Sequence, residues 1–277
     1  MSDTTPGLDR IDTSTAHPAR RYDYWLGGKD NFEADRESGR KLLAVNPNIA
    51  VAVRQNRYFL RRVVGVLAAE HGITQFLDIG TGIPTSPNLH EVAQSINPAA
   101  RIVYVDNDPV VMVHARALLT SSEEGKTAYI EADLLDPDRI LADPALRATL
   151  DLNQPVALTC IAVLHFLPDD IAVLAALRTL LQALPSGSIF ALSHGTLDHL
   201  PPHQREAMQK ELGNVSAHGT TRPRSKQEIT VLIAGLGLDL LEPGIVSVID
   251  WRPEVDPVPG GATAEQALCW AAVARRP

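Results

Sequence analysis

Five short apolar runs alternate with amphipathic stretches through the middle of this 277-residue chain. The runs span residues 75–79, 101–105, 128–132, 156–163 and 188–193. Stretches of helical spacing lie between most of them, at residues 88–96, 109–121 and 169–184. Such alternation, with nearly continuous apolar strands, is typical of a parallel sheet that helices cover on both faces. It indicates an α/β fold.

The segments on either side of this alternation complete the predicted fold. Residues 33–45 and 48–71 have helical spacing, and Gly72 ends the second of these helices. Two further apolar runs, at residues 245–251 and 267–274, flank a turn rich in Pro and Gly, which is typical of an antiparallel hairpin. The sequence therefore predicts a Rossmann-like, seven-stranded, mostly parallel sheet with an antiparallel C-terminal hairpin and an N-terminal helical cap.

The same patterns divide the chain into an arm and one domain. Residues 1–18 are polar and predict a flexible arm. Residues 19–277 are expected to form a single domain, of which 19–72 are the cap and 73–277 the Rossmann-like core. Late in the core, a capping box at residues 225–228 predicts the start of another helix.

Charge and cysteine content narrow the compartment and the partners. The chain has 25 Lys and Arg against 33 Asp and Glu, and the net charge of −8 disfavours nucleic acid and anionic membranes as partners. Its first residues lack the apolar segment of a secretion signal. Cys160 and Cys269 lie in apolar runs that predict buried thiols in a reducing compartment. We therefore expect a cytoplasmic protein.

A glycine-containing turn follows the first strand of the alternation. Asp78 precedes Gly80-Thr81-Gly82, and glycines at this point let the backbone approach a ligand at the carboxyl end of a strand. A dinucleotide site would have a third glycine where Thr85 stands, and backbone N–H groups for a diphosphate. A carboxylate at position 78 suits a cationic group instead, such as the ammonium of a ligand.

The next two strands also end in acids. Asp106 follows Gly80 by 26 residues, at a place where a carboxylate can accept both hydroxyls of a ribose. Asp133 follows the third strand, where it can accept the exocyclic amine of adenine. Together with Asp78, these acids match an amino-acid group, a ribose and a base. S-adenosylmethionine contains all three and carries no phosphate.

An aromatic segment near the N-terminus gathers four of the chain's 13 aromatic residues within 11 positions. Tyr22, Tyr24, Trp25 and Phe32 surround the pair Gly27-Gly28. One interpretation is a hydrophobic strap that anchors the arm. The other is a lid over a ligand, because rigid aromatic faces beside a Gly-Gly hinge suit the clamping of a flat group.

Several segments together resemble a known family. They are residues 17–37, 55–62, 76–94, 102–118 and 132–141. The chain resembles the class I S-adenosylmethionine-dependent methyltransferases, and within them an actinobacterial group, once a domain of unknown function, called the S-adenosyl methyltransferase family. The resemblance implies that the cofactor site contains Gly80, Gly82, Asp106, Asn107 and Asp133. It also implies that the block from Tyr22 to Asn31 folds near that site. We therefore expect Tyr22, Gly28 and Asn31 to contact the cofactor. Thr81 and Leu134, which lie beside Gly80 and Asp133 in the sequence, are expected to do the same.

Two residues are the candidates for catalysis. His165 follows the fourth strand, where it would face the methyl group of the cofactor, although a His that only caps the strand end is an equal alternative. Tyr24 is the candidate lid residue at the acceptor. Cys160 lies inside the strand and is expected to be a packed thiol, and His194 is a weaker alternative.

Neither a metal site nor an amino-methylating motif is expected. Pro201 and Pro202 keep His194, His199 and His203 from sharing one helical face, so we expect no metal. The fourth strand is not followed by the Asn-Pro-Pro-Tyr or Asp-Pro-Pro-Tyr sequence of enzymes that methylate amino groups of nucleic acids.

The sequence thus predicts methyl transfer from S-adenosylmethionine to an unidentified small molecule. Two alternatives stay open: a non-catalytic protein that binds or senses S-adenosylmethionine, and an NAD-dependent oxidoreductase. The sequence names neither the acceptor nor the oligomeric state.

Overall fold

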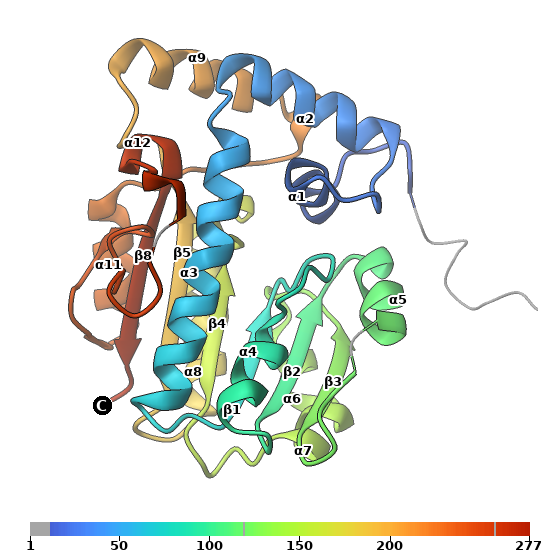
Figure 1. Cartoon of the computed structure of the whole chain (residues 1–277), viewed down its shortest axis with the longest axis vertical. Coiled ribbons are helices and arrows are strands. Elements are labelled where there is room, and N and C mark those ends of the chain that lie inside the picture. The colour runs from blue at the N-terminus through green and yellow to red at the C-terminus, as the bar shows by residue number, and fades with distance from the viewer. Residues whose placement is uncertain (1–11, 119, 258) are drawn as a thin grey trace, which may run out of the picture.

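The centre of the fold is a mixed sheet (Figure 1). The computed structural model describes residues 12–118, 120–257 and 259–277, and in these residues the sheet has eight strands in the order β3-β2-β1-β4-β5-β8-β6, with β7 paired to β8. The strands are β1 Gln75–Ile79, β2 Arg101–Asp106, β3 Lys126–Glu131, β4 Ala157–Ile161, β5 Ile189–Gly195, β6 Asp239–Leu240, β7 Val246–Ser247 and β8 Cys269–Arg275. Strands β3, β2, β1, β4 and β5 are parallel to one another, and β8 runs antiparallel to β5. The predicted α/β class and the antiparallel C-terminal edge are confirmed.

The expected count of seven strands is wrong by one, and the expected hairpin is shorter than predicted. Within the apolar run 245–251 only Val246 and Ser247 pair with β8. Val248 and Trp251 are buried, but the chain turns there, so their hydrophobicity reflects packing rather than strand pairing. The additional strand, β6, has only two residues, both exposed, and carries no apolar pattern that sequence analysis could detect.

Helices cover both faces of the sheet, and alternate strand residues point to each. On one face, Phe76 and Ile102 are buried in a cluster with residues of α3 Ile49–Ala69 and α4 Leu89–Ile96. On the other face, Leu77 and Val103 are buried with residues of α8 Asp170–Gln182 and α11 Lys226–Gly235. This double cover explains why the central strands are apolar on both sides.

The predicted helices agree closely with the observed ones. The stretches predicted at 33–45 and 109–121 are α2 Glu33–Val45 and α5 Pro109–Leu118, and α11 begins with the predicted capping box, in which the side chain of Ser225 accepts from the Glu228 N–H. The other helices are α1 Pro18–Leu26, α6 Pro137–Ala142, α7 Pro144–Thr149, α9 Pro202–Leu212, α10 Val215–His218 and α12 Ala264–Ala267, with 3-10 turns at Leu164–Phe166 and Pro259–Gly261. No helix in the described part of the chain is long and apolar enough to cross a membrane.

Helix α1 is one of the elements that the sequence analysis does not predict. It lies beneath α2 and above the carboxyl ends of the strands (Figure 1). His17 caps its N-terminus, Pro18 occupies its first position, and Gly27 ends it at a φ of 84°. Residues 1–11 of the predicted arm lie outside the described residues. The rest of that arm is tied to α1, because the Arg20 guanidinium donates to the carbonyls of Asp12 and Thr15 at 2.8 and 3.0 Å.

The side chain of Trp251 packs the turn after β7 against the long helix α3. Its side chain is 2% exposed and meets Phe59 edge to face at a ring distance of 5.6 Å. We expect Trp251→Ala to lower the free energy of unfolding by about 3–5 kcal/mol, because it empties a large buried volume. Urea denaturation measures this. Val231→Ala, at a side chain that is 67% exposed, is the control and should change stability by less than about 0.5 kcal/mol. An equal loss in both variants would contradict the assignment.

Candidate cofactor site

A cavity of about 360 Å³ opens at the carboxyl edge of the parallel strands. Its floor consists of residues that follow β1, β2, β3 and β4, and its other walls come from α1 and α3. The volume lies within the range of small-molecule sites, and the position is the one at which open α/β sheets bind ligands.

The glycine turn after β1 is fastened to β2. The N–H of Gly80 donates to the carbonyl of Val105 at 2.8 Å. Gly80 and Gly82 both have a φ near 70°, which other residues rarely adopt. A Cβ on Gly80 would also lie 2.3 Å from Val163, so this glycine lets the turn approach the end of β4. Gly80, Thr81 and Gly82, which are predicted to contact the cofactor, all line the cavity.

Asp78 is a buried carboxylate at the bottom of the cavity. Its Oδ1 accepts a hydrogen bond from Thr159 at 2.5 Å. Burial raises the pKa of Asp78 from its usual 3.8 to about 6, although Thr159 and the positive charge of Arg57 act in the opposite direction. Arg57 also lines the cavity and donates to the carbonyl of Pro87 at 2.7 Å. An acid and a guanidinium therefore face the same space.

The residues after β2 and β3 form the second half of the floor. Asp106 accepts from the N–H groups of Gly82 and Asp108 at 2.8 and 2.9 Å, and burial raises its pKa. Asn107 donates to Asp133 at 2.9 Å, which ties the ends of β2 and β3 together. All three residues line the cavity with Leu134, and the sequence predicts that all four contact the cofactor.

Only part of the predicted lid block reaches the cavity. Tyr22 lines it, and its hydroxyl donates to the Val53 carbonyl at 2.9 Å and accepts from Asn56 at 3.0 Å. Burial raises the pKa of Tyr22 to about 12. Asp23, which was not predicted, also lines the cavity. Helix α1 thus presents two neighbouring residues to the ligand space.

Gly28, Asn31 and Tyr24 do not line the cavity. Asn31 instead donates to Asp23 at 2.7 Å, and Gly28 lies against the Asp23 carboxylate, so both support a lining residue rather than a ligand. Tyr24 packs against Gly39 of α2, where a Cβ would come within 2.6 Å of its ring. Residues two apart on a helix point in nearly opposite directions, which explains why Tyr22 faces the cavity and Tyr24 does not.

His165 does not face the cavity either. Its Nδ1 accepts from the Gly195 N–H at 3.2 Å, and its ring packs against those of Phe166 and His194. Burial and, secondarily, the neighbouring His194 hold the pKa of His165 well below its usual value. The imidazole is therefore neutral, with its proton on Nε2, and has no free lone pair with which to act as a base. Phe166 occupies the cavity wall in its place.

The remaining His and Cys candidates are structural. His194 accepts at Nε2 from Arg224 at 3.0 Å, and burial lowers its pKa to about 3. Cys160 and Cys269 are buried free thiols, as predicted. Within residues 12–118, 120–257 and 259–277, no three His, Cys, Asp or Glu side chains group as metal ligands.

An open α/β sheet with a glycine turn and acids after three adjacent strands is the framework of a class I S-adenosylmethionine-dependent methyltransferase. The family model described as S-adenosyl methyltransferase matches residues 4–277, and the chain belongs to this family. It is therefore an S-adenosylmethionine-dependent methyltransferase, and S-adenosylmethionine is its cofactor.

Solved structures agree with this assignment. A DUF574 family protein from Streptomyces avermitilis is 48% identical, with a TM-score of 0.88 over 97% of this chain and all of that one. A candidate methyltransferase from Thermobifida fusca is 40% identical, with a TM-score of 0.84 over 98% of this chain and 97% of that one. Human N-acetylserotonin methyltransferase, solved in complex with SAM, shares the fold at 17% identity and a TM-score of 0.51, over 97% of this chain and 64% of that one. No curated protein matches the chain.

The raised pKa of Asp78 predicts a stability cost that depends on pH. Between pH 4 and 6 the unfolded chain releases the Asp78 proton while the folded protein retains it, so this residue makes folding less favourable as pH rises. The shift of about two units corresponds to about 3 kcal/mol. We expect ligand-free Asp78→Asn to be more stable than the parent protein by up to that amount above pH 6, and to lose the advantage near pH 4.

Urea denaturation at pH 4 and pH 7.5 measures this difference. Asp239→Asn, at an exposed position of β6, is the matched control and should show no such dependence. A stability gain of Asp78→Asn that is equal at both pH values would contradict the buried charge as its source.

Proposed function

We propose that this enzyme methylates a small molecule that is enclosed beneath α1. The observation that carries the proposal is the position of α1, whose Pro18, Ala19, Tyr22 and Asp23 line the cavity from above. A macromolecular acceptor would have to displace this helix. The net charge of −8 supports a small acceptor over a nucleic acid, and the buried free thiols support a cytoplasmic location.

The floor residues suit the successive parts of the cofactor. Asp78 and Arg57 have the charges to bind the ammonium and carboxylate of its amino-acid group, beside the glycine turn formed by Gly80, Thr81 and Gly82. Asp106 would accept the ribose hydroxyls. Asp133, held by Asn107, would accept the adenine amine, and Leu134 would pack on the base. The presence of Asp78, Asp106 and Asp133 in one cavity, together with Arg57, supports this placement of S-adenosylmethionine.

We propose that the acceptor occupies the β4 side of the cavity. The cofactor residues follow β1, β2 and β3, so the remaining space lies toward β4, where Ile161, Val163, Phe166 and Leu167 form an apolar wall with Gly219 and Thr220. None of these six residues titrates. We propose that this wall excludes water and aligns the acceptor with the methyl group, which accounts for catalysis by positioning and desolvation.

Because none of the six wall residues can remove a proton, the wall restricts which acceptor groups can act as the nucleophile. The cofactor supplies an electrophilic methyl group on a positively charged sulfur, and its transfer leaves the neutral thioether product. An acceptor that is a neutral amine, or an acidic group that ionises in water, needs no protein base before it attacks. We therefore propose an amine, a thiol or a phenol as the acceptor group, in preference to an aliphatic alcohol.

The cofactor placement predicts the effect of Asp106→Ala. Loss of a buried carboxylate that accepts the ribose hydroxyls should weaken binding of S-adenosylmethionine by about 1–3 kcal/mol, as measured by calorimetry. Asp239→Ala is the control at an exposed acid. Unchanged affinity in Asp106→Ala would contradict the ribose placement, and binding of NAD in place of S-adenosylmethionine would restore the oxidoreductase alternative.

The acceptor is found by incubation of the enzyme with labelled S-adenosylmethionine and a cell metabolite extract, followed by mass spectrometry. We expect a product heavier by one methyl group. Phe166→Ala should reduce its formation at least tenfold with cofactor affinity nearly intact, whereas Ile171→Ala, at a residue 83% exposed on α8, should not. Tight cofactor binding without transfer to any extract component would favour a sensor instead.

A further inference from the structure

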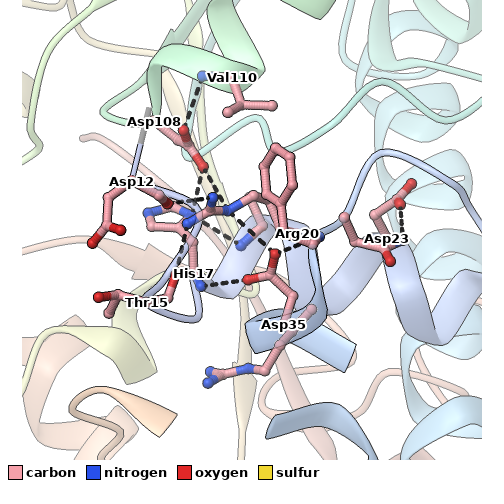
Figure 2. A network of polar contacts seen from close by, with 12 residues as sticks. Asp12, Thr15, His17, Arg20, Asp23, Asp35, Asp108 and Val110 are labelled. Carbon is pink, nitrogen blue, oxygen red and sulfur yellow. Dashed lines mark hydrogen bonds and ion pairs between the residues drawn. The ribbon is translucent and has the colours of Figure 1, made fainter. Parts of the chain in front are cut away.

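Three consecutive residues at the end of β2, Asp106 to Asp108, face three different parts of the site. Asp106 lies at the proposed ribose position, and Asn107 donates to Asp133. The side chain of Asp108 points toward His17 and Arg20 at the start of α1 (Figure 2). The N–H of Asp108 donates to Oδ1 of Asp106 at 2.9 Å, so the ribose acid and Asp108 are connected by one hydrogen bond.

Asp108 joins the Rossmann-like core to the start of α1. Its Oδ1 accepts from the Val110 N–H at 2.9 Å and caps α5. Its Oδ2 lies 3.0 Å from Nδ1 of His17, which caps α1, and 3.6 Å from Nε of Arg20. Although burial alone would raise the pKa of Asp108, the contacts with His17, Val110 and Arg20 lower it below its usual value.

A second carboxylate completes the arrangement from above. Oδ2 of Asp35, on α2, lies 3.6 Å from the same Arg20 Nε, and Oδ1 of Asp35 accepts from the His17 N–H at 2.8 Å. Figure 2 shows Arg20 between the two acids. Arg20, Asp35 and Asp108 are each at most 5% exposed.

The burial of these three charged side chains favours one position of α1 on the core. If α1 moved away from the core, Asp108 would lose its contacts with His17 and Arg20, and separation of a buried carboxylate from a guanidinium is strongly unfavourable. The first turn of α1 also supplies Pro18 and Ala19 to the cavity wall, so the contacts of Asp108 set where that wall stands.

We propose that Asp108, with His17 and Arg20, is a latch that holds α1 closed over bound cofactor, and that the latch is coupled to the ribose through Asp106. A ribose on Asp106 orders the Asp106–Asp108 loop and thereby orients Asp108 toward α1. By reciprocity, closure of α1 raises cofactor affinity by the same factor. Arg20 and Asp108, which do not line the cavity, are thus positioning residues, and His17 both lines the cavity and contacts Asp108. The inference rests on the proposed ribose placement.

The test compares Asp108→Asn with the parent protein, using the demethylated cofactor, S-adenosylhomocysteine, as the probe. Asn retains the cap of α5 but removes the charge that faces His17 and Arg20. We expect affinity to fall about fivefold to fiftyfold, mainly through faster dissociation, a size typical of coupling between sites. Asp143→Asn is the matched control, because Asp143 caps α7 by accepting from the Ala145 N–H and does not line the cavity.

Hydrogen exchange separates a latch from a general loss of stability. In the parent protein and in Asp143→Asn, S-adenosylhomocysteine should slow exchange of the α1 amides, and in Asp108→Asn this ligand-dependent protection should be lost. His17→Asn, which retains a capping side chain on α1, should act in the same direction, and the double variant should lose less than the sum of the two. If Asp108→Asn does not fold, His17→Asn decides.

Two results would contradict the proposal, and each identifies a different wrong assumption. Unchanged affinity, dissociation rate and α1 protection in Asp108→Asn, while Asp106→Ala weakens binding, would overturn the latch and leave the cofactor placement intact. Unchanged affinity in Asp106→Ala would overturn the ribose placement on which the latch rests.

Discussion

The parallel pairing of β1 with β2 is the contact on which the rest of the site depends. Its register sets Ile79 opposite Val105, so both strands end at the same level of the sheet. The Val105 carbonyl can then hold the N–H of Gly80, and Asp106 can hold the N–H of Gly82. The glycine turn is therefore shaped by the neighbouring strand as much as by its own residues, and the site forms only when the sheet has formed.

This construction places two carboxylates where burial opposes their ionisation. The pKa values of Asp78 and Asp106 are both raised by burial. Such acids reduce stability in the ligand-free protein, and a cationic or hydroxyl-bearing ligand provides partners that the protein does not supply in full. Two large apolar clusters, one on each face of the sheet, provide the stability that tolerates this cost.

Most of the architecture could be predicted because hydrophobic periodicity determines which elements form. The run at 75–79 is β1 itself, and the capping box at Ser225 starts α11 as expected. The acids at 78, 106 and 133 could be placed together because parallel strands end at one edge of a sheet. Short elements could not be predicted, because a two-residue strand such as β6 is too short to show a hydrophobic periodicity.

The side chains of the lid and of the β4 turn could not be assigned in this way, because their direction depends on the local backbone. The clustering of aromatic residues alone gives no direction to each side chain, although His17, Pro18 and Gly27 carry the start and stop signals of a helix. A helix that begins at Pro18 rotates about 100° per residue, and that rotation separates Tyr22 from Tyr24.

The local backbone also explains why the side chain of His165 does not face the cavity. The chain leaves β4 through Ala162, which has a φ of 59°, and then makes a 3-10 turn at Leu164–Phe166. This path turns the imidazole toward Gly195 and the neighbouring Phe166 ring toward the cavity. A strand pattern predicts that some residue after β4 meets the ligand, but the backbone of the turn selects which one. In the mechanism proposed above, the selection of Phe166 in place of a titrating group makes the acceptor side a surface for positioning rather than for proton transfer.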